Sequence, residues 1–93
     1  MLEVILIGAF IAQQPNGLFC RFSSVVDAPT HWNMTREEYL SNITGTVHTK
    51  AEGIYILNNY LRSFSEVVEY FIPRIMTQKD FDDLVITMST PCH

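Results

Sequence analysis

The residues of this 93-residue chain that could carry out nucleophilic chemistry are its two cysteines, its three histidines and one aspartate close to them in sequence. A thiol enzyme would need Cys20 as nucleophile, one of His31, His48 and His93 as base, and Asp27 to orient that base. A reactive thiol also needs an exposed, electropositive setting that lowers its pKa. Cys20 instead stands in the middle of an expected strand, on the side expected to face the core, and no catalytic motif surrounds it. We therefore interpret Cys20 as a small buried apolar residue.

Metal and phosphate chemistry find equally little support in the spacing of the residues. Cys92 and His93 are adjacent and terminal, and no Cys-x-x-Cys pair or similar ligand spacing occurs. The glycines, at positions 8, 17, 45 and 53, do not cluster into a phosphate-binding loop. Adjacent acids such as Asp82 and Asp83 point about 100° apart on a helix, so they do not form a general acid–base pair. The sequence thus predicts no catalytic residues, no metal site, no cofactor and no enzyme.

The charge balance favours a protein partner over nucleic acid. Ten acidic residues oppose six Lys and Arg residues, which gives a formal net charge of −4 and an isoelectric point near 5.1. Nucleic-acid affinity depends mainly on basic side chains that displace counterions, so direct DNA or RNA binding is not expected. An acidic chain suits basic protein surfaces instead, including the nucleic-acid grooves of other proteins.

The last third of the sequence is more acidic than the rest. Five carboxylates follow residue 65, at Glu66, Glu69, Asp80, Asp82 and Asp83. If two helices pack antiparallel around Pro73, these side chains form one negative patch that could mimic nucleic-acid phosphates and bind a partner. The alternative is that Asp80 and its neighbours only stabilise the positive end of a helix dipole.

Trp32, the single tryptophan, is the other candidate partner-binding residue. It lies in the run 27–33, whose Asp, Pro and Asn residues predict a loop. A tryptophan on a loop can anchor an interface, because it buries a large area at a low entropic cost. The alternative is that Trp32 packs into the core beside the helix that follows it.

Size and composition predict one folded domain over residues 1–93. A hydrophobic fraction of 47% and an aromatic fraction of 12% are typical of a packed globule. The apolar stretch 4–12 is too short to cross a bilayer and lacks the basic flank of a signal peptide. We therefore expect no membrane association and a cytoplasmic location, in which the two cysteines stay reduced.

The expected fold is an α+β sandwich of two layers that opens with a β-hairpin, at about 2–13 and 18–25. The turn is predicted by Gln14-Pro15-Asn16-Gly17, which stands between two apolar runs and suits a type I turn followed by a glycine bulge. This register pairs Phe10 with Phe22 and Ala12 with Cys20.

The two faces of the hairpin have different expected roles. The core face consists of Leu6, Phe10, Ala12, Cys20 and Phe22. If helices cover only that face, the apolar residues of the opposite face (Ile7, Ile11 and Phe19) need a partner or a second copy of the chain to bury them.

Helices are expected after the hairpin at about 36–43, 50–72 and 78–88. Thr35, Thr49 and Thr77 are each followed three residues later by an acid, as in a helix-capping box. Apolar residues from Ile54 to Phe71 step by three or four, which predicts one long helix. Two alternatives remain open, namely a hairpin over 44–57 and a strand at 84–88.

Three functional hypotheses follow from these features. The first is a small, acidic, non-enzymatic interaction protein that binds, and could inhibit, a protein partner. A phage-type anti-defence inhibitor, similar in kind to an anti-CRISPR or anti-restriction protein, would be one example. The second is a structural homo-oligomer, such as a homodimer, formed through the edge of the hairpin. The third is a small thiol enzyme that uses Cys20.

Overall fold

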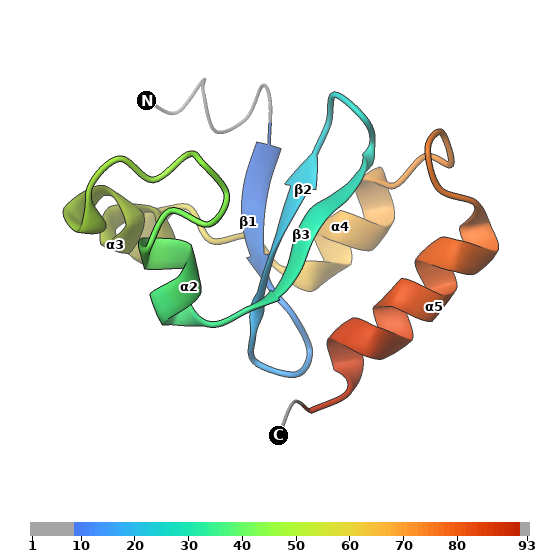
Figure 1. Cartoon of the computed structure of the whole chain (residues 1–93). Helices are drawn as coiled ribbons and strands as arrows, with labels where there is room; N and C mark the ends of the chain where they lie inside the picture. The colour runs from blue at the N-terminus through green and yellow to red at the C-terminus, as the bar shows by residue number, and fades with distance from the viewer. Residues whose placement is uncertain (1–8, 92–93) are drawn as a thin grey trace.

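The computed structural model describes residues 9–91 and has the expected α+β class (Figure 1). A three-stranded antiparallel sheet in the order β1-β2-β3 comes first, and helices follow it. The strands are β1 (Ala9–Gln13), β2 (Phe19–Ser23) and β3 (Ala28–Met34). The helices are α2 (Arg36–Leu40), α3 (Lys50–Asn59), α4 (Phe64–Tyr70) and α5 (Gln78–Ser89). The part of the expected first strand at 2–8, with Leu6 and Ile7, lies outside the described residues.

The hairpin between β1 and β2 has the register that the turn residues predict. Gly17 has a φ of +89°, a left-handed conformation that glycine adopts without steric cost. Its N–H donates to the carbonyl oxygen of Gln14 at 2.9 Å, and the Gln14 N–H donates to Leu18 O at 2.7 Å. Phe10 accordingly pairs with Phe22 and Ala12 with Cys20, which confirms the predicted register.

The run 27–33 is a strand for most of its length, so the predicted loop is wrong. Asp27 and Asn33 have φ values of 54° and 56°, and the pairing of β3 with β2 shifts register twice. Pro29 is tolerated because β3 is an edge strand with no neighbour on its far side. The turn-forming residues therefore mark the two ends and the bulges of an irregular strand.

The predicted helix over 50–72 is two helices, α3 and α4. Between them the chain pairs with β1, because the Arg62 N–H donates to Ile11 O at 2.9 Å and Arg62 O accepts from the Gln13 N–H at 3.4 Å. The alternative hairpin over 44–57 is also wrong, since α3 begins at Lys50. The connection at 60–63 thus runs along the edge of β1 that does not pair with β2.

The other helices differ less from expectation. Helix α2 ends at Leu40, three residues before the predicted end, and α5 extends one residue past the predicted 78–88, so the alternative strand at 84–88 is wrong. Thr35, Thr49 and Thr77 each accept a hydrogen bond from a backbone N–H three residues later, as predicted. These threonines fix where the helices start.

Helices cover both faces of the sheet, so the fold has three layers instead of the two expected (Figure 1). On the α4–α5 side, a buried cluster contains Phe10, Ala12, Cys20, Phe22, Val67, Phe81, Leu84 and Met88. On the α2–α3 side, a second cluster contains Ile11, Met34, Tyr39 and Val47, with Phe19 packed against it. The chain itself therefore buries Ile11, and the expectation that this face needs a partner or a second copy is wrong for the described residues.

Candidate functional site

Cys20 lies in the core and has none of the features of an active thiol. Its side chain is fully buried on the α4–α5 side of the sheet. Burial raises the pKa of Cys20 from 9.0 to about 12, because the thiolate is poorly solvated there. His31, one of the candidate bases, has its Nδ1 atom 3.0 Å from the hydroxyl of its neighbour Thr30. Within residues 9–91, no three His, Cys, Asp or Glu side chains converge in a way that could hold a metal ion.

The predicted acidic residues occupy two adjoining helices but are not joined by direct contacts. The rings of Phe71 and Phe81 stack with centroids 3.9 Å apart, which places the end of α4 beside the first turn of α5. Glu66 is partly buried, and its Oε2 lies 3.1 Å from Nη1 of Arg62, which precedes α4. On α5, Asp83 pairs with Lys79 at 3.0 Å.

The remaining acids of the predicted patch lie on the outer surface of these helices. Asp82 accepts a hydrogen bond from Gln78 Nε2 at 2.9 Å. Asp80 and Glu69 are exposed, and the Asp80 N–H donates to the capping hydroxyl of Thr77. The four exposed acids of α4 and α5 are Glu69, Asp80, Asp82 and Asp83, and we call them the acidic face.

Trp32 and the acidic face lie on different elements of the fold. Trp32 is in β3, at the edge opposite to the β1 edge that contacts α4. Its side chain is 41% exposed, so it is neither on a loop nor in the core. Trp32 is therefore on a different element from the helices that carry the acidic face.

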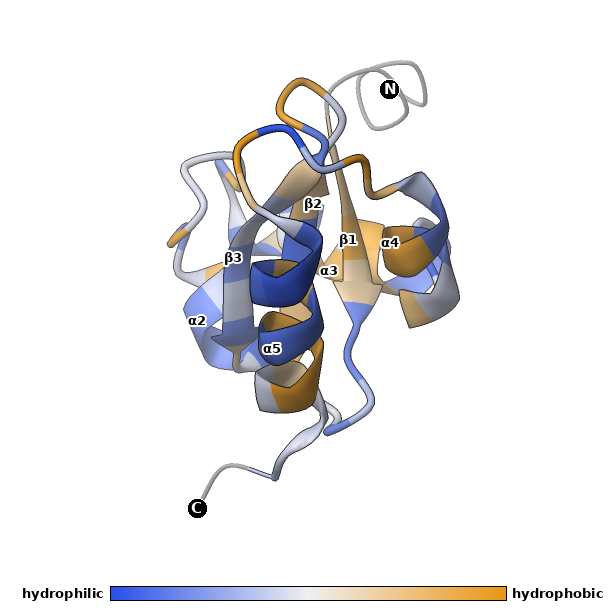
Figure 2. Ribbon diagram, turned by 90° about the vertical axis from the view of Figure 1, so that its right-hand side faces the viewer, coloured by the Kyte–Doolittle hydropathy of each residue, from blue (hydrophilic) through white to orange (hydrophobic). Residues whose placement is uncertain are grey.

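One end of the molecule carries a group of exposed apolar side chains that the sequence analysis did not identify. They come from the β2–β3 turn and from the end of α4 with the connection to α5. They are Val25, Tyr70, Ile72 and Ile75, each between 50% and 71% exposed, and we call them the apolar end. Figure 2 shows hydrophobic segments in both connections at this same end of the fold. An ion pair between Asp27 and Arg74, 3.1 Å long, ties the two connections together.

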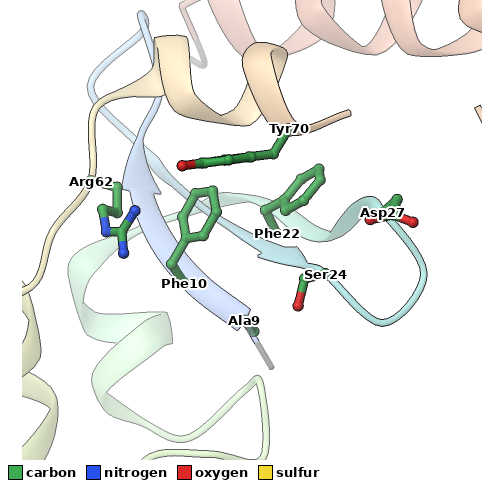
Figure 3. A pocket seen from close by; sticks show the side chains of 7 residues that line it. All are labelled: Ala9, Phe10, Phe22, Ser24, Asp27, Arg62 and Tyr70. Carbon is green, nitrogen blue, oxygen red and sulfur yellow. The ribbon is translucent and has the colours of Figure 1, made fainter. Parts of the chain in front are cut away.

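A pocket of about 250 Å³ opens beside the apolar end (Figure 3). It is lined by Ala9, Phe10, Phe22, Ser24, Asp27, Arg62 and Tyr70. The rings of Phe10 and Phe22 stack at 5.4 Å, and Tyr70 meets Phe10 edge-on at 6.2 Å. Arg62 stands at one end of these rings and Asp27 at the other, so the pocket is apolar in its middle and polar at its ends (Figure 3).

The pocket could not be read from the sequence because its lining comes from five separate segments. The hairpin register, which pairs Phe10 with Phe22, indicates only that both side chains point to one face of the sheet. Exposed Ile72 and Ile75 flank Pro73 and Arg74, a pattern that could have indicated an apolar connection between helices. It was missed because isolated exposed apolar residues are common.

Comparisons with known proteins do not assign this chain to a family. No protein-family model, no curated protein and no solved structure matches the chain. No helix within residues 9–91 has both the length and the apolar character to span a membrane. The function must therefore be argued from the surface of the molecule itself.

Proposed function

We propose that this chain is a non-enzymatic interaction protein that binds a protein partner through the apolar end and the acidic face. The observation that carries the proposal is the grouping of Val25, Tyr70, Ile72 and Ile75 at one end of a small domain. Grouped, exposed apolar side chains mark interaction sites more often than scattered ones do. Aromatic and aliphatic residues of this kind form the centres of protein interfaces.

The charge of the surrounding surface indicates the chemistry of the partner. The net charge of the chain is −4, and on α4 the acidic face includes Glu69, which directly precedes Tyr70 of the apolar end, while its other members lie on α5. Basic protein surfaces are electrostatically complementary to such a rim. We therefore propose a partner with a basic, partly apolar surface, such as a nucleic-acid-binding protein. Occupying that surface would inhibit the partner.

The test is affinity capture with the full chain and two variants that change charge equally. Glu69→Gln with Asp82→Asn neutralises two carboxylates of the acidic face, neither of which forms an ion pair with another residue of the described range 9–91. Glu37→Gln with Glu38→Gln neutralises two on α2, where glutamine at position 38 can still complete the capping box. We expect the first variant to weaken capture at least fivefold and the second to leave it unchanged.

Two further observations decide between specific and incidental capture. A partner bound through complementary charge dissociates as the salt concentration rises. A partner captured through its nucleic-acid surface is also eluted by an excess of a random-sequence DNA duplex. Equal loss of capture in both variants would contradict the proposal, because net charge and not the acidic face would then be responsible.

A further inference from the structure

The pocket at the apolar end is smaller than most ligand sites but has an aromatic lining with polar groups at its ends. Its volume of about 250 Å³ falls just below the roughly 300–1,000 Å³ of sites for drug-sized molecules. It can therefore hold one ring with a short substituent. The stacked rings of Phe10 and Phe22 and the ring of Tyr70 offer apolar and aromatic contacts to such a ring.

Arg62 is held in a fixed position at the end of this pocket. Its backbone is paired with Ile11 and Gln13 of β1, and its guanidinium lies 5.3 Å from the centre of the Phe10 ring. Its Nη1 donates to Glu66 Oε2 at 3.1 Å. A guanidinium has five N–H donors in a planar fork. Within residues 9–91, the Arg62 side chain makes one hydrogen bond, the one to Glu66. Donors remain for an acceptor that enters the pocket.

The opposite end of the pocket determines how a charged ligand would lie. Asp27 is there, 16% exposed at its side chain and paired with Arg74. An anionic group is repelled by Asp27 and attracted by Arg62, so it would point toward Arg62. A phosphate or a nucleotide fits poorly, because the pocket is small and has one arginine in its lining.

We infer that the pocket binds one aromatic group that carries a carboxylate, with the ring on Phe10 and Phe22 and the carboxylate on the free donors of Arg62. A free aromatic acid and the C-terminal residue of a protein both present this chemistry, and the test below distinguishes them. Glu66 competes with the ligand for Arg62. Its neutralisation therefore strengthens binding.

The test is a titration of the full ¹⁵N-labelled chain with phenylacetate, followed by chemical shifts. For a ligand of this size we expect a dissociation constant on the order of 1 mM, with the largest shifts at Phe10, Phe22, Arg62 and Tyr70. Phenylacetamide, the neutral isostere, should bind about tenfold more weakly, because a hydrogen bond to a charged group contributes more than a neutral one. Benzyltrimethylammonium should not bind.

Variants at the end of the pocket separate the role of the carboxylate from that of the ring. Arg62→Gln should weaken phenylacetate binding about tenfold and leave phenylacetamide binding unchanged, whereas Arg62→Lys should have an intermediate effect. Glu66→Gln should strengthen phenylacetate binding severalfold. The spectrum of each variant shows whether it is folded, and Glu66→Gln tests the inference without removing the arginine.

A peptide competitor distinguishes a free aromatic acid from a protein C-terminus as the source of the carboxylate. Acetyl-Gly-Gly-Phe with a free carboxylate should compete with phenylacetate, and its amide should not. A peptide that binds at least tenfold more tightly than phenylacetate indicates a protein C-terminus, and the reverse order indicates a free acid. The inference is overturned if the shifts fall outside the pocket, if phenylacetamide binds as well as phenylacetate, or if the trimethylammonium compound binds best. None of these results depends on the protein partner proposed above.

Discussion

On the α4–α5 side of the sheet the buried cluster contains eight residues, whereas on the α2–α3 side it contains four. Helix α5 has twelve residues and contributes Phe81, Leu84 and Met88 to its cluster. Helix α2 has five residues, and its main contribution to the other cluster is Tyr39.

The two sides also differ in how completely they are filled. On the α2–α3 side, a Cβ atom added to Gly53 would lie 2.5 Å from Leu40 Cδ2 and 3.0 Å from Val47 Cγ1, so α3 packs closely against its neighbours. On the α4–α5 side, the same rings that form the core also line an open pocket and lie beside exposed apolar residues. The comparison teaches that the larger buried cluster and the surfaces proposed for binding lie on the same side of the sheet.

The largest expected difference between the two sides is in the cost of removing a core side chain. We expect Phe22→Ala to lower the free energy of unfolding by about 3–5 kcal/mol, because it removes a fully buried ring from the larger cluster. Ile11→Ala, on the α2–α3 side, should cost less, at about 2–3 kcal/mol. Urea unfolding of both variants checks this order, and an equal or greater cost at Ile11 would break the comparison.

A second difference concerns how the free energy of unfolding changes at alkaline pH. The raised pKa of Cys20, about 12 against 9.0, means that the unfolded chain loses a proton above pH 9 while the folded chain keeps it. Stability is therefore present below pH 9 and decreases as pH rises from 9 toward 12. Between pH 8.5 and 10.5 this loss amounts to about 2 kcal/mol.

Substitution of Cys20 measures that contribution directly. In a Cys92→Ser background, Cys20→Ala should remove most of the decrease in unfolding free energy between pH 8.5 and 10.5. Burial and the charge of Glu52 also raise the pKa of Tyr39. Tyr39→Phe is therefore the substitution on the α2–α3 side that corresponds to Cys20→Ala on the α4–α5 side. The same decrease in the parent and in Cys20→Ala would show that Cys20 is not responsible.

Helix caps give a smaller and more local difference. Thr77→Ala should lower stability by about 1 kcal/mol and accelerate hydrogen exchange throughout α5, because Thr77 accepts the bond from the Asp80 N–H. Thr35→Ala should accelerate exchange mainly in α2, because it removes the hydroxyl that accepts the bond from the Glu38 N–H. Exchange monitored by NMR separates the two, and faster exchange in α5 after the Thr35 change would contradict the independence of the two sides.

The smallest expected effect is that of a surface ion pair. Lys79 and Asp83 have side chains that are 84% and 60% exposed, so solvent screens their attraction. Lys79→Ala should change the free energy of unfolding by less than about 0.5 kcal/mol. A loss above 1 kcal/mol in thermal or urea unfolding would mean that the acidic face is strained and that Lys79 holds it together.

The sequence allowed prediction of those parts of the fold that depend on local chemistry. The register of the hairpin followed from Gly17 at the bulge, and the start of each helix from Thr35, Thr49 and Thr77. Local hydrogen bonds and steric preferences determine these features, so they can be read from a few adjacent residues.

Features that depend on distant contacts were not predicted. Strand β3 was missed because Pro29 and Asn33 are turn residues by composition, although Asn33 is held by bonds to Gln14, with the Asn33 N–H donating to Gln14 Oε1 at 2.6 Å. The long helix divides because Arg62 pairs with β1. The three-layer arrangement and the pocket follow from that division, since it sends α3 and α4 to opposite faces.

The most direct test of the account compares partner capture by two matched surface variants. Ile72→Ser with Ile75→Ser removes two side chains of the apolar end, and Ile43→Ser with Tyr55→Ser removes two equally exposed ones from the α2–α3 side. In quantitative affinity capture from the native host, we predict that the first variant loses at least nine-tenths of the protein retained by the parent chain, roughly the effect of one interface hot spot. The second should retain it. Loss in the second variant and retention in the first would contradict the account.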